Sequence, residues 1–325
     1  MKNHQLIEIG NVLKKYSSFA IFSHANADGD AFGSMLGLGM TLKLLGKKVS
    51  YFLPEPVPKV YAFLKDYNLI NVAPLNHNDV GILLDSSDIG RIDQLSTHFK
   101  SFDVTINIDH HETNDYFATY NYTDKDAPST TCIILKLIED AQLPINSDIS
   151  NALYVGLLTD TGSFHYANTT RNAFLTATKL VKYGADPSSM AKKIFEEETL
   201  AHLKLIGIAL ERMNLRNKIA FSYVTYTDMK SLNASEEDAE GIINLVRKYK
   251  DADVAILFKE VGNKVIRVSL RSKRKNINVQ DIAVLFNGGG HAAASGCTLH
   301  GDLHEAMEQL LSKAEIMLKD ANKNK

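Results

Sequence analysis

Short apolar runs alternate with longer segments of helical period in the first half of the chain. The runs are rich in β-branched and aromatic residues: FAIFS (19–23), KVSYFL (48–53), VGILLD (80–85) and VTINID (104–109). Near-continuous apolar strands of this kind are typical of parallel sheets that are covered on both faces. We therefore expect an α/β fold, with a parallel sheet in the N-terminal domain and helices on both faces of it.

Helices are predicted between these strands and after them. The segment 31–46 is apolar all round, and its small residues Gly33 and Gly37 predict a buried helix that lies close to the sheet. After Asp160 the chain takes a strongly helical pattern that ends with the segment 196–213. We predict a linker helix there, because a strand-rich pattern begins again directly after it.

The second half of the chain predicts a smaller, mixed α+β domain. A strand is expected at 218–226, and a polar-faced helix at 235–250 is expected to begin with Ser235 as its N-cap. The apolar runs 254–260 and 264–272 are separated by a short VGN turn, which is typical of a β-hairpin.

The length of the chain also favours two domains. With 325 residues, the chain is longer than a single hydrophobic core usually serves. The patterns place the first domain at 1–195, the linker helix at 196–213 and the second domain at 214–325.

Composition narrows the function classes. Lys and Arg number 36 against 38 Asp and Glu, which argues against a protein that coats long nucleic acids with a basic surface. The two cysteines, Cys132 and Cys297, form no CxxC motif, so neither a disulfide framework nor a thiolate metal site is indicated. Because Glu8 interrupts the N-terminal apolar stretch and no long apolar segment follows, we expect a cytoplasmic protein with no secretory signal and no membrane partner.

Acidic and imidazole side chains follow the predicted strands and end the later apolar run ALYVGLLTD (152–160). In an open parallel sheet the carboxyl ends of the strands meet at one edge, so four separate segments can bring these groups together. Histidine and carboxylate ligands suit Mn²⁺ or similar ions, whereas structural zinc sites favour sulfur. The set consists of His24, Asp28, Asp30, Asp85, Asp109, His110, His111 and Asp160.

Several of these residues also have a purely structural interpretation. Asp85 alone would suit an ordinary turn at a strand end, and one of Asp28 and Asp30 is expected to cap the helix that follows. Adjacent residues in an extended chain point to opposite sides. On geometry alone, at most one of His110 and His111 should therefore be a direct ligand.

A glycine-rich segment in the second half is a candidate anion site. Gly288, Gly289 and Gly290 can present backbone N–H groups to a phosphate, and His291 follows as a further donor. The alternative is a flexible turn. The nearby segment RVSLRSKRK adds a basic cluster, which can equally be a solvated edge. Its members are Arg267, Arg271, Lys273, Arg274 and Lys275.

These motifs, in this order, resemble a known family. HANADGD (24–30), LLDSSDIGR (83–91), DHH (109–111) and GLLTDTGSF (156–164) are similar to the motifs of the DHH phosphoesterases. NGGGHAAASG (287–296) resembles the glycine-rich signature of the associated DHHA1 domain. The resemblance implies a DHH catalytic, metal-binding domain followed by a DHHA1 substrate-binding domain. The compact length is most similar to that of the bifunctional oligoribonucleases and 3′-phosphoadenosine 5′-phosphate phosphatases.

The resemblance implies a two-metal site. One ion would be held by His24, Asp28 and Asp85. The second would be held by Asp30, Asp85, His110 and Asp160, so that Asp85 bridges the two. The expected ions are two Mn²⁺, with Co²⁺ or Mg²⁺ as alternatives. Ala27 stands where the family often has proline, which leaves the ligand set intact.

Roles at the substrate follow from the same resemblance. His111 would lie beside the scissile phosphate, and Asp109 would position the histidines. Because two metal ions can activate water directly, no nucleophilic serine is needed, and Ser129 is predicted to be a helix N-cap instead. The implied substrate-binding residues are Arg271, Gly289, Gly290 and His291.

The implied activity is hydrolysis of very short RNA to mononucleotides and of 3′-phosphoadenosine 5′-phosphate to AMP. Short oligonucleotides and nucleotides would be the substrates, without a stable complex with long nucleic acids, and a homodimer is expected from the resemblance alone. One alternative is a phosphodiesterase for linear or cyclic signalling dinucleotides such as pApA, pGpG or cyclic di-AMP. Another is a nucleotide sensor that binds without turnover.

Overall fold

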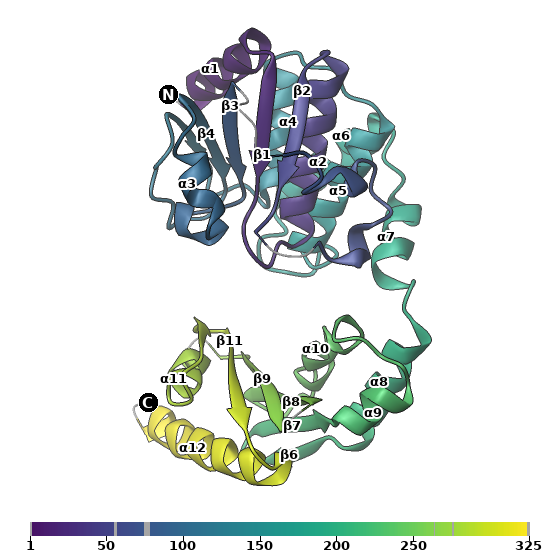
Figure 1. The fold of residues 1–325 in the computed structure, drawn as a ribbon, viewed down its shortest axis with the longest axis vertical. Helices are drawn as coiled ribbons and strands as arrows, with labels where there is room; N and C mark the ends of the chain where they lie inside the picture. The colour runs from purple at the N-terminus through teal and green to yellow at the C-terminus, as the bar shows by residue number, and fades with distance from the viewer. Residues whose placement is uncertain (1, 55–56, 75–78, 263, 275, 324–325) are drawn as a thin grey trace. The chain divides into compact units, whose positions relative to one another are not determined.

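The computed structural model describes residues 2–54, 57–74, 79–262, 264–274 and 276–323. The chain divides into two compact units, Met1–Glu197 and Glu198–Lys325, each built on a sheet of its own (Figure 1). Within the described ranges, no helix combines the length and the apolar character that crossing a membrane requires.

The first unit contains a sheet of five parallel strands in the order β2-β1-β3-β4-β5. Its strands are β1 (Ser18–Phe22), β2 (Lys48–Phe52), β3 (Val80–Leu84), β4 (Val104–Asp109) and β5 (Tyr120–Thr123). The first four confirm the apolar runs to within one residue at each end. Strand β5 is absent from the sequence prediction, because the short sequence YNYT lacks an apolar run.

Helices cover both faces of this sheet, as predicted. In β1, Phe19 and Ile21 join the core that contains residues of α1, α2, α4 and α5, whereas Ala20 and Phe22 pack with residues of α3 and η3. The helical elements of the unit are α1 (Lys2–Lys15), α2 (Gly29–Leu44), η1 (Lys59–Tyr61), η2 (Tyr67–Leu69), η3 (Ile89–Ile92), α3 (Leu95–Phe99), α4 (Thr130–Asp140), α5 (Ser147–Asp160), α6 (Arg171–Lys182) and α7 (Pro187–Phe195).

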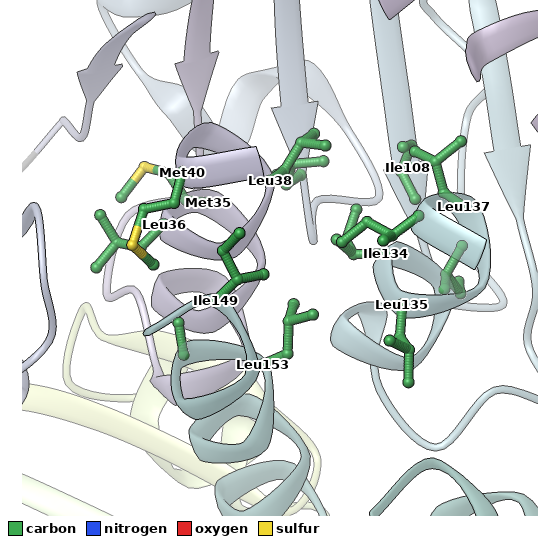
Figure 2. Close-up of a cluster of buried hydrophobic side chains, with 14 of the residues drawn as sticks. Met35, Leu36, Leu38, Met40, Ile108, Ile134, Leu135, Leu137, Ile149 and Leu153 are labelled. Atoms are coloured by element: carbon green, nitrogen blue, oxygen red, sulfur yellow. The ribbon is translucent and has the colours of Figure 1, made fainter. Parts of the chain in front are cut away.

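Helices α2 and α5 lie side by side, with Ile149 and Leu153 of α5 directed towards α2 (Figure 2). The prediction that Gly33 and Gly37 bring α2 close to the sheet is wrong, because both face α5 instead. A Cβ atom at Gly33 would lie 2.5 Å from the carbonyl oxygen of Ala152, and one at Gly37 would lie 2.7 Å from Leu153 Cδ2. The small residues therefore set the spacing between two helices.

The second unit contains a mixed sheet in the order β10-β11-β9-β8-β7-β6. Its strands are β6 (Asn214–Arg216), β7 (Ile219–Val224), β8 (Val254–Gly262), β9 (Val265–Ser272), β10 (Gly289–His291) and β11 (Ala294–His300). Strands β7 and β8 are parallel, and the other neighbours are antiparallel. The predicted hairpin is confirmed as β8 and β9, and the mixed α+β class of this half is confirmed with it.

Helices also pack on both faces of the second sheet. One face of β8 joins a core with residues of α11 and α12, and the other joins a core with residues of α8, α9 and α10. Within the segment 196–213, the helix α8 contributes Leu205 and Ala209 to the second unit's core. The helical elements are α8 (Leu200–Glu211), α9 (Tyr226–Ser231), η4 (Glu237–Ala239), α10 (Ile242–Val246), α11 (Val279–Val284) and α12 (Leu303–Lys323).

The single helix predicted over 235–250 is wrong. The segment forms η4 and α10, which are separated by Gly241 at a φ of 77°. A residue in this left-handed conformation cannot continue a right-handed helix. The predicted N-cap is also wrong, because η4 begins after Glu236, which makes no side-chain cap hydrogen bond. Ser235 Oγ still donates to Asp238 Oδ2 at 2.7 Å and accepts the N–H of Asp238 at 3.4 Å.

Candidate active site

The candidate site lies at the point where the first sheet reverses its strand order. Strand β1 pairs with β2 on one side and β3 on the other, so the chain crosses β1 between these two strands. Ligands of open α/β sheets bind at such a switch point, outside the carboxyl ends of the strands. His24 and Asp28 lie in the loop after β1, and Asp85 directly follows β3.

Asp85 occupies the centre of the site. It is buried, and its backbone adopts a left-handed φ of 58°, which is costly for a non-glycine residue and typical of functional positions. Its Oδ1 accepts the hydroxyl hydrogen of Thr130 at 2.9 Å. The Nε2 atoms of His24 and His110 lie 3.5 Å from Oδ2 and 3.6 Å from Oδ1, respectively. Asp85 therefore faces ligand atoms from two different segments.

Asp28 and Asp30 have different roles at the start of α2. Asp28 is the N-cap and accepts the N–H groups of Asp30 and Ala31 at 3.0 and 3.1 Å, which confirms that one of the two acids caps this helix. Asp30 is buried and accepts the backbone N–H groups of Thr130 at 2.6 Å and Thr131 at 3.0 Å. The N-terminus of α4 thus holds the Asp30 carboxylate.

Two imidazole rings present Nε2 to the site. His24 Nδ1 lies 2.7 Å from the carbonyl oxygen of Ala25, and His110 Nδ1 lies 3.4 Å from that of Ala127. Because a carbonyl oxygen can only accept, both Nδ1 atoms carry the hydrogen. A neutral ring then has its lone pair on Nε2, which is the arrangement that binds metals.

His110 and His111 lie on the same side of the chain. Strand β4 ends at Asp109. The Nδ1 atom of His111 lies 3.9 Å from Asp85 Oδ1, and the Nε2 atom of His110 lies 3.6 Å from the same oxygen. The two rings are 4.6 Å apart. The expectation that the two side chains point to opposite sides is therefore wrong, because strand β4 ends at Asp109 and the alternation of a strand no longer applies.

Asp109 is held in its ionised form beside His111. Its Oδ1 accepts Nδ1–H of His111 at 2.6 Å and the backbone N–H of His110 at 2.8 Å, and its Oδ2 accepts Nδ2–H of Asn114 at 2.7 Å. Burial opposes ionisation, but the hydrogen bonds from His111 and Asn114 keep the pKa of Asp109 below its usual value. The same hydrogen bond to Asp109 raises the pKa of His111. The hydrogen bond therefore favours the ionised carboxylate and the protonated imidazole.

Asp160 reaches the site from a helix. The apolar run 152–160 forms the last part of α5, and Asp160 is its final residue. Its Oδ2 lies 3.7 Å from His110 Nε2, and its backbone oxygen accepts Nδ2–H of Asn168 at 3.0 Å. Burial, followed by repulsion from Asp30, raises the pKa of Asp160 to about 7.

The buried acids raise one another's pKa values. Burial raises the pKa of Asp30, and so does nearby Asp28. His110 and the α4 amides lower this pKa, but the net shift is upward. Burial and the neighbouring Asp30 raise the pKa of Asp85 well above its usual value. Although burial opposes it, the surrounding carboxylates raise the pKa of His110. Crowded carboxylates of this kind are stabilised by bound cations.

The donor set fits divalent cations. Ligand atoms lie within 4.8 Å of one another in three groups, which share Asp85 and His110 between them. Carboxylate oxygens and imidazole nitrogens are the donors that Mn²⁺, Co²⁺ and Mg²⁺ accept in different degrees. The groups are His24–Asp28–Asp85, Asp30–His110–Asp160 and Asp85–His110–His111.

Sequence reasoning missed two residues that support this cluster. Thr130 contacts both Asp30 and Asp85, and the buried Asn114 connects Asp109 to Asn107. The Thr130 contacts join positions that are distant in the sequence, and the Asn114 contacts depend on how the chain turns after β4, so no motif reveals them. The predicted cap at the same helix is confirmed, because Ser129 Oγ accepts the N–H of Cys132 at 3.3 Å.

In the second unit, the glycine-rich segment is part of a sheet. Gly289, Gly290 and His291 form the edge strand β10 rather than a loop. Ala294 of β11 is the register partner of His291 on one side and of Arg271 on the other. The sheet thus places the candidate substrate-binding residues of this unit on neighbouring strands.

Arg271 differs from the other two arginines of the basic cluster. Arg267 pairs with Glu236, and Arg274 pairs with Asp253 at 2.8 Å. Lys275 lies outside the described residues. Within the described ranges, Arg271 has no carboxylate at ion-pair distance, and burial together with nearby Arg247 lowers its pKa. Arg267 and Gly288 also line a cavity of about 610 Å³ on this sheet.

Comparison with known proteins extends the match over both units. Residues 18–157 match the DHH family, N-terminal domain, and residues 216–320 match the DHHA1 domain. The bifunctional oligoribonuclease and PAP phosphatase NrnA of Thermus thermophilus is 31% identical over 297 residues, which covers 90% of this chain and 87% of the relative. The Bacillus subtilis protein of the same name is 25% identical over 96% of this chain and 98% of its own.

Solved structures show the same arrangement of elements. An exopolyphosphatase-related protein from Bacteroides fragilis has a TM-score of 0.86 at 26% identity, covering 97% of this chain and 98% of its own. RecJ of Thermus thermophilus in complex with Mn²⁺ has a TM-score of 0.57 at 14% identity and shares the fold alone, over 98% of this chain and 55% of RecJ. The ordered match of both domains and the similarity to relatives over nearly their whole length show that this chain belongs to the DHH/DHHA1 phosphoesterase family.

Proposed function

We propose that this protein hydrolyses short oligoribonucleotides to mononucleotides and 3′-phosphoadenosine 5′-phosphate to AMP. The observation that carries the proposal is the set of three ligand groups joined by Asp85 and His110. Relatives similar over both units are named for oligoribonuclease and PAP phosphatase activities. Both reactions transfer a phosphoryl or nucleotidyl group to water, so one site can perform both.

His24, Asp28 and Asp85 would hold one metal ion, and Asp30, Asp85, His110 and Asp160 would hold the other. We propose Mn²⁺ for both, because it accepts imidazole and carboxylate donors together. Bound ions would supply Lewis acidity to the phosphate and lower the pKa of a water molecule. The Nδ1–H groups of the two histidine ligands bond to backbone carbonyls, which keeps Nε2 directed to the site.

His111 would supply a proton. Its Nδ1–H is held by the Asp109 carboxylate, and this hydrogen bond favours the protonated ring. We assign His111 to donate its other ring hydrogen, on Nε2, to the oxygen that leaves phosphorus. Asp109 orients the ring and stabilises its charge, and water completes the reaction without a covalent enzyme intermediate.

The second unit would bind the rest of the substrate. Arg271 would contact a phosphate, since it has no carboxylate partner in the described part of the chain. Gly289, Gly290 and His291 would offer donors from the edge strand β10. The near-neutral net charge of −2 supports short substrates over a stable complex with long nucleic acids.

The test is turnover of both substrates. The protein is incubated with Mn²⁺ and either an RNA dinucleotide or 3′-phosphoadenosine 5′-phosphate, alongside an Asp85→Asn variant. We expect both substrates to be hydrolysed by the natural sequence and neither by the variant. Hydrolysis of pGpG or cyclic di-AMP alone, or nucleotide binding without any product, would refute the proposal.

A further inference from the structure

We propose that Arg91 binds a phosphate group of the substrate beside the metal cluster, an inference that rests on the proposed function. Arg91 lies in η3, in the connection that follows β3 and Asp85. Its backbone oxygen accepts the N–H of Ala25 at 2.8 Å, and its Nη2 atom lies 3.2 Å from His24 Nδ1. The guanidinium is thus next to a candidate metal ligand.

The local structure fixes this position. Asp88 caps η3 by accepting the N–H of Gly90 at 2.8 Å, and Ser86 Oγ donates to the backbone oxygen of Asp88 at 2.9 Å. The bond from Ala25 to Arg91 then ties η3 to the loop that carries His24. These contacts fix the backbone from which the Arg91 side chain extends, next to the loop that carries His24.

The Arg91 guanidinium has N–H donors that are available to a ligand. His24 Nδ1 gives its hydrogen to the carbonyl oxygen of Ala25, so it cannot also accept one from Arg91. Arg91 Nη2 and His24 Nδ1 are therefore both hydrogen-bond donors, and they form no hydrogen bond with each other. No carboxylate of the described residues lies at ion-pair distance from Arg91, and the residue is only partly buried. A planar group with five N–H donors therefore lies beside the candidate metal ligand His24, free to bind an anion.

The charges at the site also favour phosphate binding by Arg91 once two metal ions are bound. The four candidate carboxylate ligands, Asp28, Asp30, Asp85 and Asp160, carry four negative charges when ionised, which two divalent cations neutralise. Arg91 adds a positive charge beside this cluster, which a phosphate group of the substrate would match. Arginine binds two phosphate oxygens at once, so it would also orient the group.

The experiment measures binding of AMP and of inorganic phosphate to the Mn²⁺-loaded protein by calorimetry. The variants are Arg91→Gln and Arg91→Lys, and Lys100→Gln is the control for loss of one positive charge from an exposed position of the same unit. We expect Arg91→Gln to weaken both ligands about 10- to 100-fold, as for loss of a charged hydrogen bond. Arg91→Lys should restore part of the affinity, and Lys100→Gln should bind as the natural sequence does.

Two further readouts separate the alternatives. Mn²⁺ affinity should be the same in Arg91→Gln and the natural sequence, whereas a role in positioning His24 would weaken it. Unchanged affinity for inorganic phosphate in Arg91→Gln would overturn the inference, as would loss of AMP binding alone. Failure of the proposed function shows differently, as absence of turnover in the natural sequence despite phosphate binding that depends on Arg91.

Discussion

At the scale of single residues, the candidate centre depends on side chains that hold its carboxylates in place. Thr130 is the most connected of these, because its amide bonds to Asp30 and its hydroxyl bonds to Asp85. Both acceptors are buried, and they belong to different segments, because Asp30 lies in the first turn of α2 and Asp85 directly follows β3. One residue thus sets the distance between two candidate ligands of separate metal groups.

Replacement of Thr130 by valine removes the hydroxyl and keeps the amide and the side-chain shape. Loss of a hydrogen bond to a metal ligand typically weakens metal binding or activity about 10- to 100-fold. We therefore expect Thr130→Val to bind Mn²⁺ more weakly by that factor in calorimetric titration, and Thr130→Ser to bind nearly as the natural sequence does. Equal affinity in Thr130→Val would show that this bond does not position Asp85.

The Asp109–His111 pair predicts a pH effect. Asp109 raises the pKa of His111 by accepting its Nδ1–H, and the proposed role of His111 requires the protonated ring. Activity should therefore fall as pH rises through the pKa of His111. In Asp109→Asn this fall should begin at lower pH, with kcat reduced about 100-fold or more. A kcat–pH profile with the same alkaline limb in both proteins would contradict the assignment.

The sequence predicts which residues meet at the site better than it predicts how they are held. Convergence of His24, Asp85 and His110 follows from the common edge of parallel strands. The shared side of His110 and His111 does not follow, because it depends on where β4 ends. The contact of Thr130 with Asp85 joins distant positions, and that of Asn114 with Asp109 depends on the turn after β4, so neither has a sequence signature.

At the scale of elements, strands with continuous apolar runs are readily predicted, and the rest depends on context. Strand β5 is short and polar, and only its pairing with β4 makes it a strand. The apolar run 152–160 is part of helix α5. Periodicity alone could not have shown this, because a short buried strand and a buried helix give the same apolar pattern. Gly241 interrupts the helix predicted at 235–250 through a φ that sequence patterns do not contain.

Two glycine substitutions, one at the contact between α2 and α5 and one in α8, should have opposite effects on stability. A Cβ at Gly33 would lie 2.5 Å from the backbone oxygen of Ala152, so Gly33→Ala should destabilise the first unit by about 1–3 kcal/mol. Gly207 lies within α8 and has open space around its Cβ position. Gly207→Ala should stabilise the second unit by about 0.5–1 kcal/mol. Calorimetric unfolding of both variants checks the pair, and a stable Gly33→Ala protein would contradict the close packing.

At the scale of the whole molecule, the two units carry different chemistry. The first unit gathers the candidate metal ligands at one edge of a parallel sheet, and the second offers Arg271 and an exposed glycine-rich strand. The family match covers both units in the same order. We therefore propose that the first unit cleaves the bond and that the second binds most of the substrate, with Arg91 as a phosphate contact from the first.

We propose above all that Asp85 joins two metal sites in one chain. The most direct test of this proposal is the stoichiometry of Mn²⁺ binding, measured by equilibrium dialysis and calorimetry on the natural sequence, on Asp85→Asn and on Asp88→Asn, which alters a neighbouring acid that caps η3. We predict two Mn²⁺ ions per chain for the natural sequence and for Asp88→Asn, and weakened binding of both ions in Asp85→Asn. A single ion in the natural sequence, or two ions bound with unchanged affinity in Asp85→Asn, would show that Asp85 does not join two metal sites.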